Sequence, residues 1–254
     1  MATIPFALQL FSVRDVLAAD CLATLKRVKE IGYSHVEVAG LADKSVEAFK
    51  ADLDAAELTP VSTHVAYEDC RSDLAGAIAM CQVLGVEWAV IPWLSPETNV
   101  TAEDWAARGV EMAAFGRAFW EAGITLCYHN HSHEFVDLDG KTPFDAIFEA
   151  AAPEDLSVEL DVGWSHYGGA DTLALMKRYA GRIPLLHIKD VKQRYEGEEP
   201  IPTELGNGAT KFAPLFKAAG EIGVKWYIVE QDESKRDPLE SARMNAAYMR
   251  VHIF

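Results

Sequence analysis

Short runs of β-branched and other apolar residues alternate along the chain with longer segments whose apolar residues recur at helical spacing. The short runs predict strands at residues 6–11, 35–39, 60–65, 88–92, 125–129, 157–162, 184–188 and 226–230. The longer segments predict helices at 20–31, 45–57, 72–84, 102–122, 143–151, 171–180 and 211–221, and from about 238. This unbroken series of β/α units predicts an α/β fold, a single (β/α)8 TIM barrel domain over residues 1–254.

Glycines follow several predicted helices, a position that favours a left-handed cap: Gly32, Gly85, Gly123, Gly181 and Gly223. An open, doubly wound sheet is the alternative fold, but no Gly-x-Gly-x-x-Gly turn follows the first predicted strand. The longest irregular stretch, about 190–209, is expected to form one functional loop, and Gly206-Asn207-Gly208 within it is expected to be a turn.

Polar residues gather where the predicted strands end, which is where a β/α barrel builds its active site. Because strand side chains alternate, Glu37 between Val36 and Val38 is expected to point into the barrel. By the same rule Glu159 and Asp161 share one face, as do His187 and Lys189. Unpaired carboxylates inside a barrel are costly, and a divalent cation removes much of that cost.

A donor set of carboxylate oxygens and imidazole nitrogen suits a hard or borderline ion, so one divalent metal ion is predicted, with Mn²⁺ first and Mg²⁺, Co²⁺ and Zn²⁺ as alternatives. The predicted metal ligands are Glu134, Asp161, His187 and Glu230. Glu134 lies beyond its strand, and His129 or His131 is the alternative ligand there.

Amino-acid composition and charge limit the kinds of partner that the protein is expected to bind. The formal net charge of −16 argues against nucleic acid and anionic membrane surfaces. No apolar run approaches the roughly 18 residues of a membrane span, and the first residues lack a signal-peptide pattern, so a cytoplasmic protein is expected. Four scattered cysteines, Cys21, Cys70, Cys81 and Cys127, are expected to be reduced thiols.

Three segments carry a family resemblance: YHNH at 128–131 followed three residues later by Glu134, LDVGW at 160–164, and HIKD at 187–190. Together they resemble the sugar phosphate isomerase/epimerase branch of the xylose isomerase-like TIM barrel superfamily, and in particular its inosose dehydratase-like members. The resemblance implies a metal held by Glu134, Asp161, His187 and Glu230, and admits a homo-oligomer. Many epimerases of the family have Glu within strand five and His three residues after the strand-six Asp, where this chain has His129 and Trp164.

These observations predict a metal-dependent isomerase or epimerase of a small sugar or keto-sugar, acting through an enediolate. A dehydratase of a keto-polyol at the same site is the alternative, and a nucleic-acid repair enzyme and a metal-free sugar-binding barrel are other classes. Glu230 is the first candidate base, Glu134 or His131 acts on the other face, and Lys189 steadies negative charge. The predicted substrate contacts are Glu37, His64, Trp93, His129, Asn130 and Trp164.

Several of these residues also admit a purely structural role. Glu37 and His64 are alternatively a buried polar network, and Trp93 and Trp164 are alternatively core. Asp161 is alternatively a helix cap, and Glu230 is alternatively an ion-pair partner of Lys189.

Overall fold

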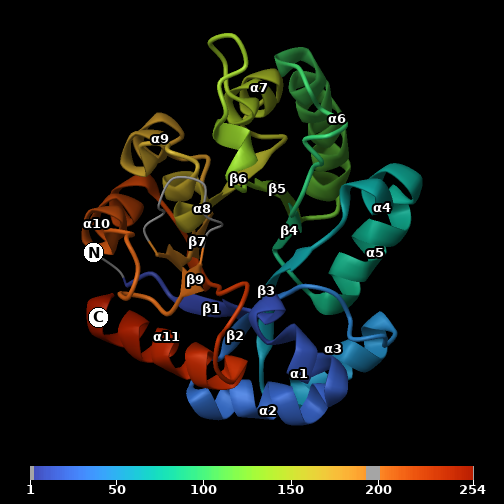
Figure 1. Cartoon of the computed structure of the whole chain (residues 1–254). Coiled ribbons are helices and arrows are strands. Elements are labelled where there is room, and N and C mark those ends of the chain that lie inside the picture. The colour runs from blue at the N-terminus through green and yellow to red at the C-terminus, as the bar shows by residue number, and fades with distance from the viewer. Residues whose placement is uncertain (1–2, 193–200, 254) are drawn as a thin grey trace.

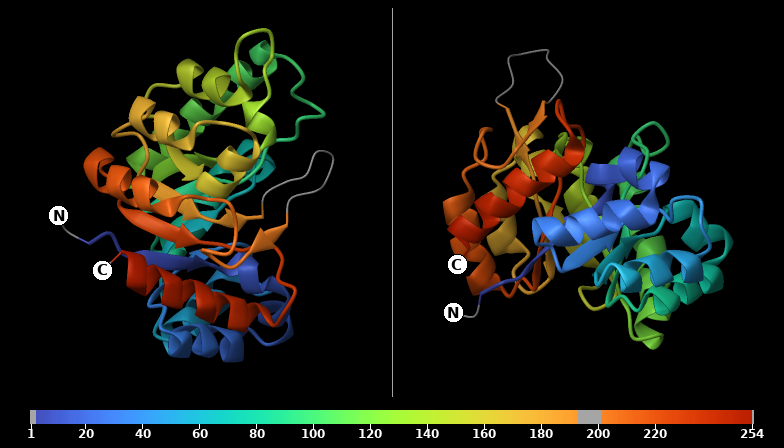
Figure 2. Two further views of the ribbon diagram at one scale, coloured as in Figure 1. Left: turned by 60° about the vertical axis from the view of Figure 1, so that its left-hand side comes forward. Right: turned by 90° about the horizontal axis from the view of Figure 1, so that it is seen from below.

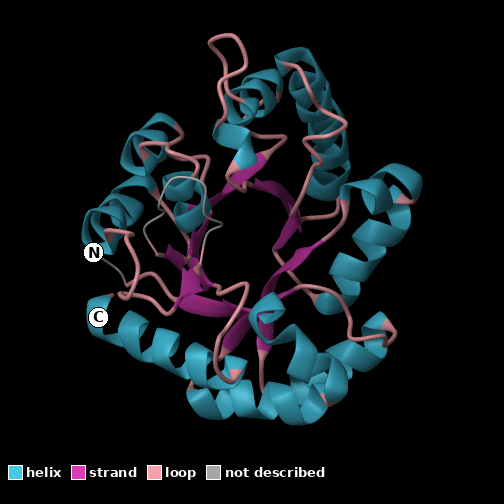
Figure 3. Ribbon diagram, in the orientation of Figure 1, coloured by secondary structure: helices cyan, strands magenta, loops and turns pink. Residues whose placement is uncertain are grey.

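The computed structural model, which describes residues 3–192 and 201–253, is a closed barrel of parallel strands surrounded by helices (Figures 1 and 3). Around the barrel the strands follow the order β1, β10, β7, β6, β5, β4, β3, β2, which confirms the predicted (β/α)8 fold. They are β1 (Phe6–Gln9), β2 (His35–Val38), β3 (Thr59–His64), β4 (Trp88–Ile91), β5 (Thr125–His129), β6 (Ser157–Asp161), β7 (Leu185–Ile188) and β10 (Trp226–Val229).

Helices form the outer ring, as the two turned views show (Figure 2). The longer ones are α2 (Cys21–Ile31), α3 (Val46–Ala55), α5 (Leu74–Leu84), α6 (Ala102–Glu121), α7 (Pro143–Ala150), α10 (Phe212–Ile222) and α11 (Pro238–His252), with the shorter α9 (Thr172–Arg178) between α7 and α10. None of the helices in the described ranges is long and apolar enough to cross a membrane.

Short helices that the sequence pattern does not separate come before some of the main ones: α1 (Arg14–Ala19), α4 (Tyr67–Ser72) and α8 (Val162–Tyr167). The predicted helix at 72–84 begins instead at Leu74, because Asp73 has a non-helical backbone and its side chain accepts from the Gly76 N–H. Asp20 separates α1 from α2 in the same way and accepts from the Ala23 N–H.

The predicted loop at 190–209 is partly ordered as a ladder. Its strands β8 (Asp190–Val191) and β9 (Pro202–Thr203) pair antiparallel, and residues 193–200 of the predicted loop lie outside the described residues. The buried Asp190 carboxylate accepts from the N–H groups of Gly206 and Gly208 at 2.9 Å each and of Thr210 at 3.1 Å. The Gly206-Asn207-Gly208 turn is therefore fixed to the barrel by a carboxylate of the chain itself.

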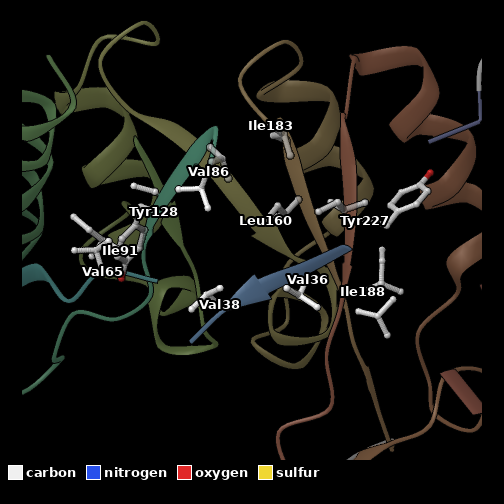
Figure 4. Close-up of a cluster of buried hydrophobic side chains, with 14 of the residues drawn as sticks. Val36, Val38, Val65, Val86, Ile91, Tyr128, Leu160, Ile183, Ile188 and Tyr227 are labelled. Atoms are coloured by element: carbon white, nitrogen blue, oxygen red, sulfur yellow. The ribbon is translucent and has the colours of Figure 1, made fainter. Parts of the chain in front are cut away.

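Alternate residues of each strand face the helices and form the core between the barrel and the surrounding helices. The buried side chains of Val36, Val38, Tyr128, Leu160 and Ile188 belong to it (Figure 4). The intervening residues face inward. Seven of them form a separate apolar cluster, namely Ala7, Val61, Trp88, Val90, Cys127, Leu185 and Ile228. The polar residues near the strand ends thus share the barrel interior with an apolar cluster.

Two glycines let α6 approach the segment that contains α7. A Cβ added to Gly116 would lie 1.7 Å from the carbonyl oxygen of Asp155, and one added to Gly109 would lie 2.3 Å from that of Ile147. Both obstacles are backbone atoms, so a larger residue forces the two segments apart. Alanine in a helix gains about 1 kcal/mol over glycine, and the clash must exceed that gain to destabilise.

We expect Gly116→Ala to lower the free energy of unfolding by about 1–3 kcal/mol in urea denaturation, the usual range for overpacking. Ala114→Gly, at an exposed position of the same helix, is the control and measures helix propensity alone. A Gly116→Ala protein as stable as the parent would contradict the close approach of the two backbones.

All four cysteines are free and buried. Burial raises the pKa of Cys21 to about 11 and, with smaller contributions from neighbouring charges, the pKa values of Cys70 and Cys81 to about 12 each. Since the thiolate is the reactive form, we expect the native protein to react very slowly with a disulfide reagent at pH 8. Four thiols should react after unfolding, and rapid modification of the folded chain would contradict this packing.

Candidate metal centre at the carboxyl end of the barrel

Strand register brings acidic and imidazole side chains together at one end of the barrel. His129 at the end of β5 lies opposite Glu159 in β6, and Asp161 at the end of β6 lies opposite His187 in β7. Glu230 directly follows β10. The strand alternation therefore turns all five side chains toward the barrel interior, and all five are buried.

Four of these residues could hold one metal ion: one ligand atom each of His129, Asp161, His187 and Glu230 lies within 4.8 Å of the others. His187 Nδ1 is 3.3 Å from Glu230 Oε2 and 3.8 Å from Asp161 Oδ2, and His129 Nε2 is 3.9 Å from Asp161 Oδ2. The set comprises two imidazole nitrogens and two carboxylate oxygens, a combination that suits a borderline divalent cation.

Buried atoms of this group are left without hydrogen bonds. Asp161 Oδ1 accepts from the Trp164 N–H at 2.7 Å and so caps α8, but Asp161 Oδ2 makes no hydrogen bond among the described residues and has only an ion-pair contact with Lys189 Nζ at 3.2 Å. His187 Nδ1 likewise makes no hydrogen bond, although Glu230 Oε2 lies 3.3 Å away. Buried polar atoms normally find partners, so these two fit a ligand between them. The cap and the metal-ligand roles of Asp161 use different oxygens and are compatible.

The other nitrogen of His187 is held by Glu37. His187 Nε2 donates to Glu37 Oε1 at 2.8 Å, and Glu37 also accepts from Gln9 Nε2 at 2.6 Å and from Ser62 Oγ. Burial raises the pKa of Glu37, but the imidazoles of His64 and His187 outweigh it and hold the pKa well below its usual value. A carboxylate behind a histidine ligand is the usual way in which a metal site fixes the ring and its tautomer.

Glu159 lies beneath the group and completes a second cluster with Glu37, His64 and His187. Its Oε2 is 3.1 Å from His129 Nδ1, 3.3 Å from His187 Nε2 and 3.7 Å from His64 Nε2. Burial, and then the nearby Glu37 carboxylate, raise the pKa of Glu159 to about 8. Glu159 and Glu37 together contact both histidines of the candidate metal group from the side away from the strand ends.

Lys189 supplies positive charge to the same carboxylates. Its fully buried Nζ lies 2.7 Å from Glu230 Oε2, 3.2 Å from Asp161 Oδ2 and 2.9 Å from Asp232 Oδ2. Burial lowers the pKa of Lys189, but these carboxylates outweigh it and raise the pKa above its usual value. The Glu230–Lys189 ion pair proposed from the sequence as an alternative role is therefore present beside the candidate metal group.

Aromatic side chains form the rim of the site. The His131 ring centroid lies 5.1 Å from that of His129, 4.8 Å from that of Trp93 and 5.6 Å from that of Trp164. Burial lowers the pKa of His131 to about 3, and its Nδ1 is buried without a hydrogen-bond partner among the described residues. The His131 imidazole next to the ligand group is therefore neutral.

Two sequence-predicted residues lie apart from the cluster. The 3₁₀ turn η2 (His133–Phe135) directs the Glu134 carboxylate to Tyr128 Oη at 2.6 Å and to the His131 N–H at 2.8 Å, so Glu134 is in neither potential metal group. In this structure the candidate ligand from β5 is the alternative, His129, and Glu134 as a metal ligand stays a prediction. Asn130 is fully buried, and its side-chain amide bonds the backbone N–H and C=O of Asp161. It therefore joins β5 to β6 and exposes no atom to a substrate.

The remaining predicted contacts occupy two levels of the site. Glu37 and His64 lie in the buried network beneath the ligand group, whereas Trp93 and Trp164 lie on the rim. Roles for Glu159 and Asp232 were not assigned from the sequence. The inward face shared by Glu159 and Asp161 was a usable signal for the first, and Asp232 lies beyond its strand, where alternation gives none.

The chain is similar to several known proteins. An inosose dehydratase of Lacticaseibacillus casei is 28% identical over 59% of this chain and 55% of its own length. One of Geobacillus kaustophilus is 25% identical over 89% of this chain and 85% of its own length. Among solved structures, a sugar phosphate isomerase/epimerase from Parabacteroides distasonis superposes with a TM-score of 0.83 at 26% identity, over 98% of this chain and 94% of that chain.

The matches to the first curated relatives span about half the length of those proteins, between 50% and 55%. The model of the family described as xylose isomerase-like TIM barrel matches residues 25–252, nearly the whole chain. With the closed barrel and the resemblance of its strand-end motifs, this match shows that the chain belongs to the xylose isomerase-like TIM barrel family.

Proposed function

We propose that this protein is a divalent-metal-dependent enzyme that removes a proton next to the carbonyl of a keto-sugar or keto-polyol. The observation that carries the proposal is the buried group of His129, Asp161, His187 and Glu230, in which Asp161 Oδ2 and His187 Nδ1 make no hydrogen bond among the described residues. We place Mn²⁺ first and keep Co²⁺, Zn²⁺ and Mg²⁺ as alternatives. When bound, such an ion supplies a Lewis acid that polarises the carbonyl and stabilises the charge left by the departing proton.

Residues of the chain would transfer the proton, stabilise negative charge and exclude water. His131, which lies beside His129 and whose Nδ1 makes no hydrogen bond among the described residues, takes or returns a proton on its side of the site, and Glu230 is the candidate base on the other side. Lys189, next to Glu230 and Asp161, steadies negative charge. The aromatic rim of Trp93 and Trp164 excludes water from the reacting atoms.

Dehydration is the outcome we favour. Glu134, which would be the second carboxylate of a two-glutamate epimerase, is bonded to Tyr128 and His131 and lies outside the ligand group. A carboxylate and a histidine are suited to remove a proton and to protonate a leaving hydroxyl. Several curated relatives are named inosose dehydratase, which supports the same choice.

Isomerisation or epimerisation is the second candidate, because a relative that superposes over almost the whole chain is named a sugar phosphate isomerase/epimerase. Incubation of inososes and keto-sugars with the Mn²⁺-loaded protein in deuterated water separates the two. A new enone absorbance supports dehydration, and deuterium incorporation without loss of water supports isomerisation. Neither product from any substrate would count against the proposal.

The carboxylate behind His187 provides a further test. We expect Glu37→Gln to weaken Mn²⁺ binding about 10–100-fold, the usual effect of removing such a partner. Ser62→Ala is the control, because it removes one hydrogen bond to Glu37 while leaving the Glu37–His187 contact. Titration calorimetry measures both, and equal affinities for the two variants would contradict the role of Glu37.

Composition supports two further proposals for this protein: that it acts in the cytoplasm, and that it does not bind nucleic acid. The family resemblance supports a small carbohydrate as its substrate. A homo-oligomer stays a prediction from the family resemblance.

A further inference from the structure

A hollow lies beside the aromatic rim of the candidate metal centre. It has a volume of about 520 Å³ and lies between α4 and the segment that follows β4. Its lining includes Tyr67, Glu68, Arg71, Trp93, Leu94 and Ser95. None of the four residues of the candidate metal group lines it, so it is a separate space with its own chemistry.

Trp93 connects the hollow to the metal centre. The indole is 47% exposed, although it is one of the largest apolar side chains of the protein. Its ring stands edge-on to His131 at 4.8 Å and to His133 at 4.5 Å between centroids, and His131 in turn touches His129 of the ligand group. Trp93 therefore lies between the hollow, which it lines, and His131, which contacts the ligand group.

The lining combines an apolar face with exposed polar side chains. Trp93, Pro92 and Leu94 provide apolar surface. Arg71 and Glu68 form an ion pair at 3.4 Å, with 59% and 73% of their side chains exposed, and such a pair is weak in water. The ion pair can therefore break, and both side chains can then hydrogen-bond to the hydroxyls of a ligand. A pyranose ring matches this lining, because it has C–H faces that pack on an indole and an edge of hydroxyls.

We propose that this hollow, the Trp93 subsite, holds a second sugar ring, so that the substrate is a glycoside instead of a single ring. The inference rests on the proposed function, which places the reacting sugar at the metal group. The buried ligand group accepts the reacting ring, the glycosidic bond passes His131, and the distal ring packs on Trp93 with Arg71 and Glu68 at its edge.

Binding by the full chain with Zn²⁺ tests the subsite without requiring turnover. The probes are methyl β-D-glucoside, cellobiose and maltose, titrated by saturation-transfer NMR. We expect at least one disaccharide to bind about tenfold more tightly than the methyl glucoside, and its distal-ring protons to receive the larger saturation. Arg71→Ala should reduce that ratio at least threefold. Arg117→Ala, an exposed arginine on α6 paired with Asp155, is the matched control and should retain it.

Equal affinities for the three sugars, or a ratio that Arg71→Ala leaves unchanged, would overturn the subsite. Tighter binding of phenyl β-D-glucoside than of either disaccharide, insensitive to Arg71→Ala, would overturn the assignment to a sugar ring. The proposed function fails separately: a protein that prefers disaccharides but shows neither proton exchange nor dehydration retains the subsite and loses the reaction.

Discussion

Asp161→Asn is expected to abolish both metal binding and turnover while leaving the barrel folded. The amide can still cap α8 through its oxygen, but its NH₂ group replaces Oδ2, which makes no hydrogen bond among the described residues, and presents hydrogens to the cation. Since a Lewis-acid metal supplies several kcal/mol of transition-state stabilisation, kcat/KM should fall by about 10³ or more. Elemental analysis of protein purified without chelator should show bound metal falling from about one ion per chain to a small fraction of that.

Asp171→Asn is the matched control for this variant. Asp171 also caps a helix, since it accepts from the Ala174 N–H at the start of α9, but it is exposed and is in neither potential metal group. The effect of replacing a capping carboxylate by an amide therefore appears in both variants, and loss of metal in only one. Full metal content and turnover in Asp161→Asn would refute the candidate metal centre.

The part of the site that lies within strands could be predicted from the sequence because strand geometry leaves little freedom. Val36 and Val38 face the helices, and this alone turned Glu37 inward. The same alternation placed Asp161 and His187 on the interior, where Asp161 Oδ2 and His187 Nδ1 make no hydrogen bond among the described residues. The fold followed in the same way, from eight apolar runs separated by helical segments.

Residues beyond the strand ends could not be placed by alternation. Glu134 lies five residues after His129, in a 3₁₀ turn whose direction depends on hydrogen bonds to Tyr128 and to the His131 backbone. Those hydrogen bonds form only once β5 and the turn are folded together, so they cannot be predicted from residue spacing. The short helices α1 and α4 went unrecognised for a related reason: single aspartates, Asp20 and Asp73, end one helix and cap the next.

The contacts of Lys189 lead to the second large effect. Replacing Lys189 by methionine removes the ammonium group from three carboxylates that remain in the barrel, those of Asp161, Glu230 and Asp232. Removing one partner of a buried ion pair leaves uncompensated charge and costs about 3–5 kcal/mol. Urea denaturation in the presence of a chelator should therefore show a loss of that size in the free energy of unfolding.

A divalent cation should reverse part of this loss, because two of the three carboxylates, those of Asp161 and Glu230, belong to the candidate metal group. Millimolar Mn²⁺ should thus stabilise Lys189→Met more than it stabilises the parent, since the ion supplies charge that the parent already has from the ammonium. Lys177→Met, at an exposed position on α9, is the control and should lose little stability with or without Mn²⁺. If Lys189→Met unfolds like the parent under both conditions, the carboxylates are not held together by charge, and the case for a cation at this end of the barrel loses its electrostatic basis.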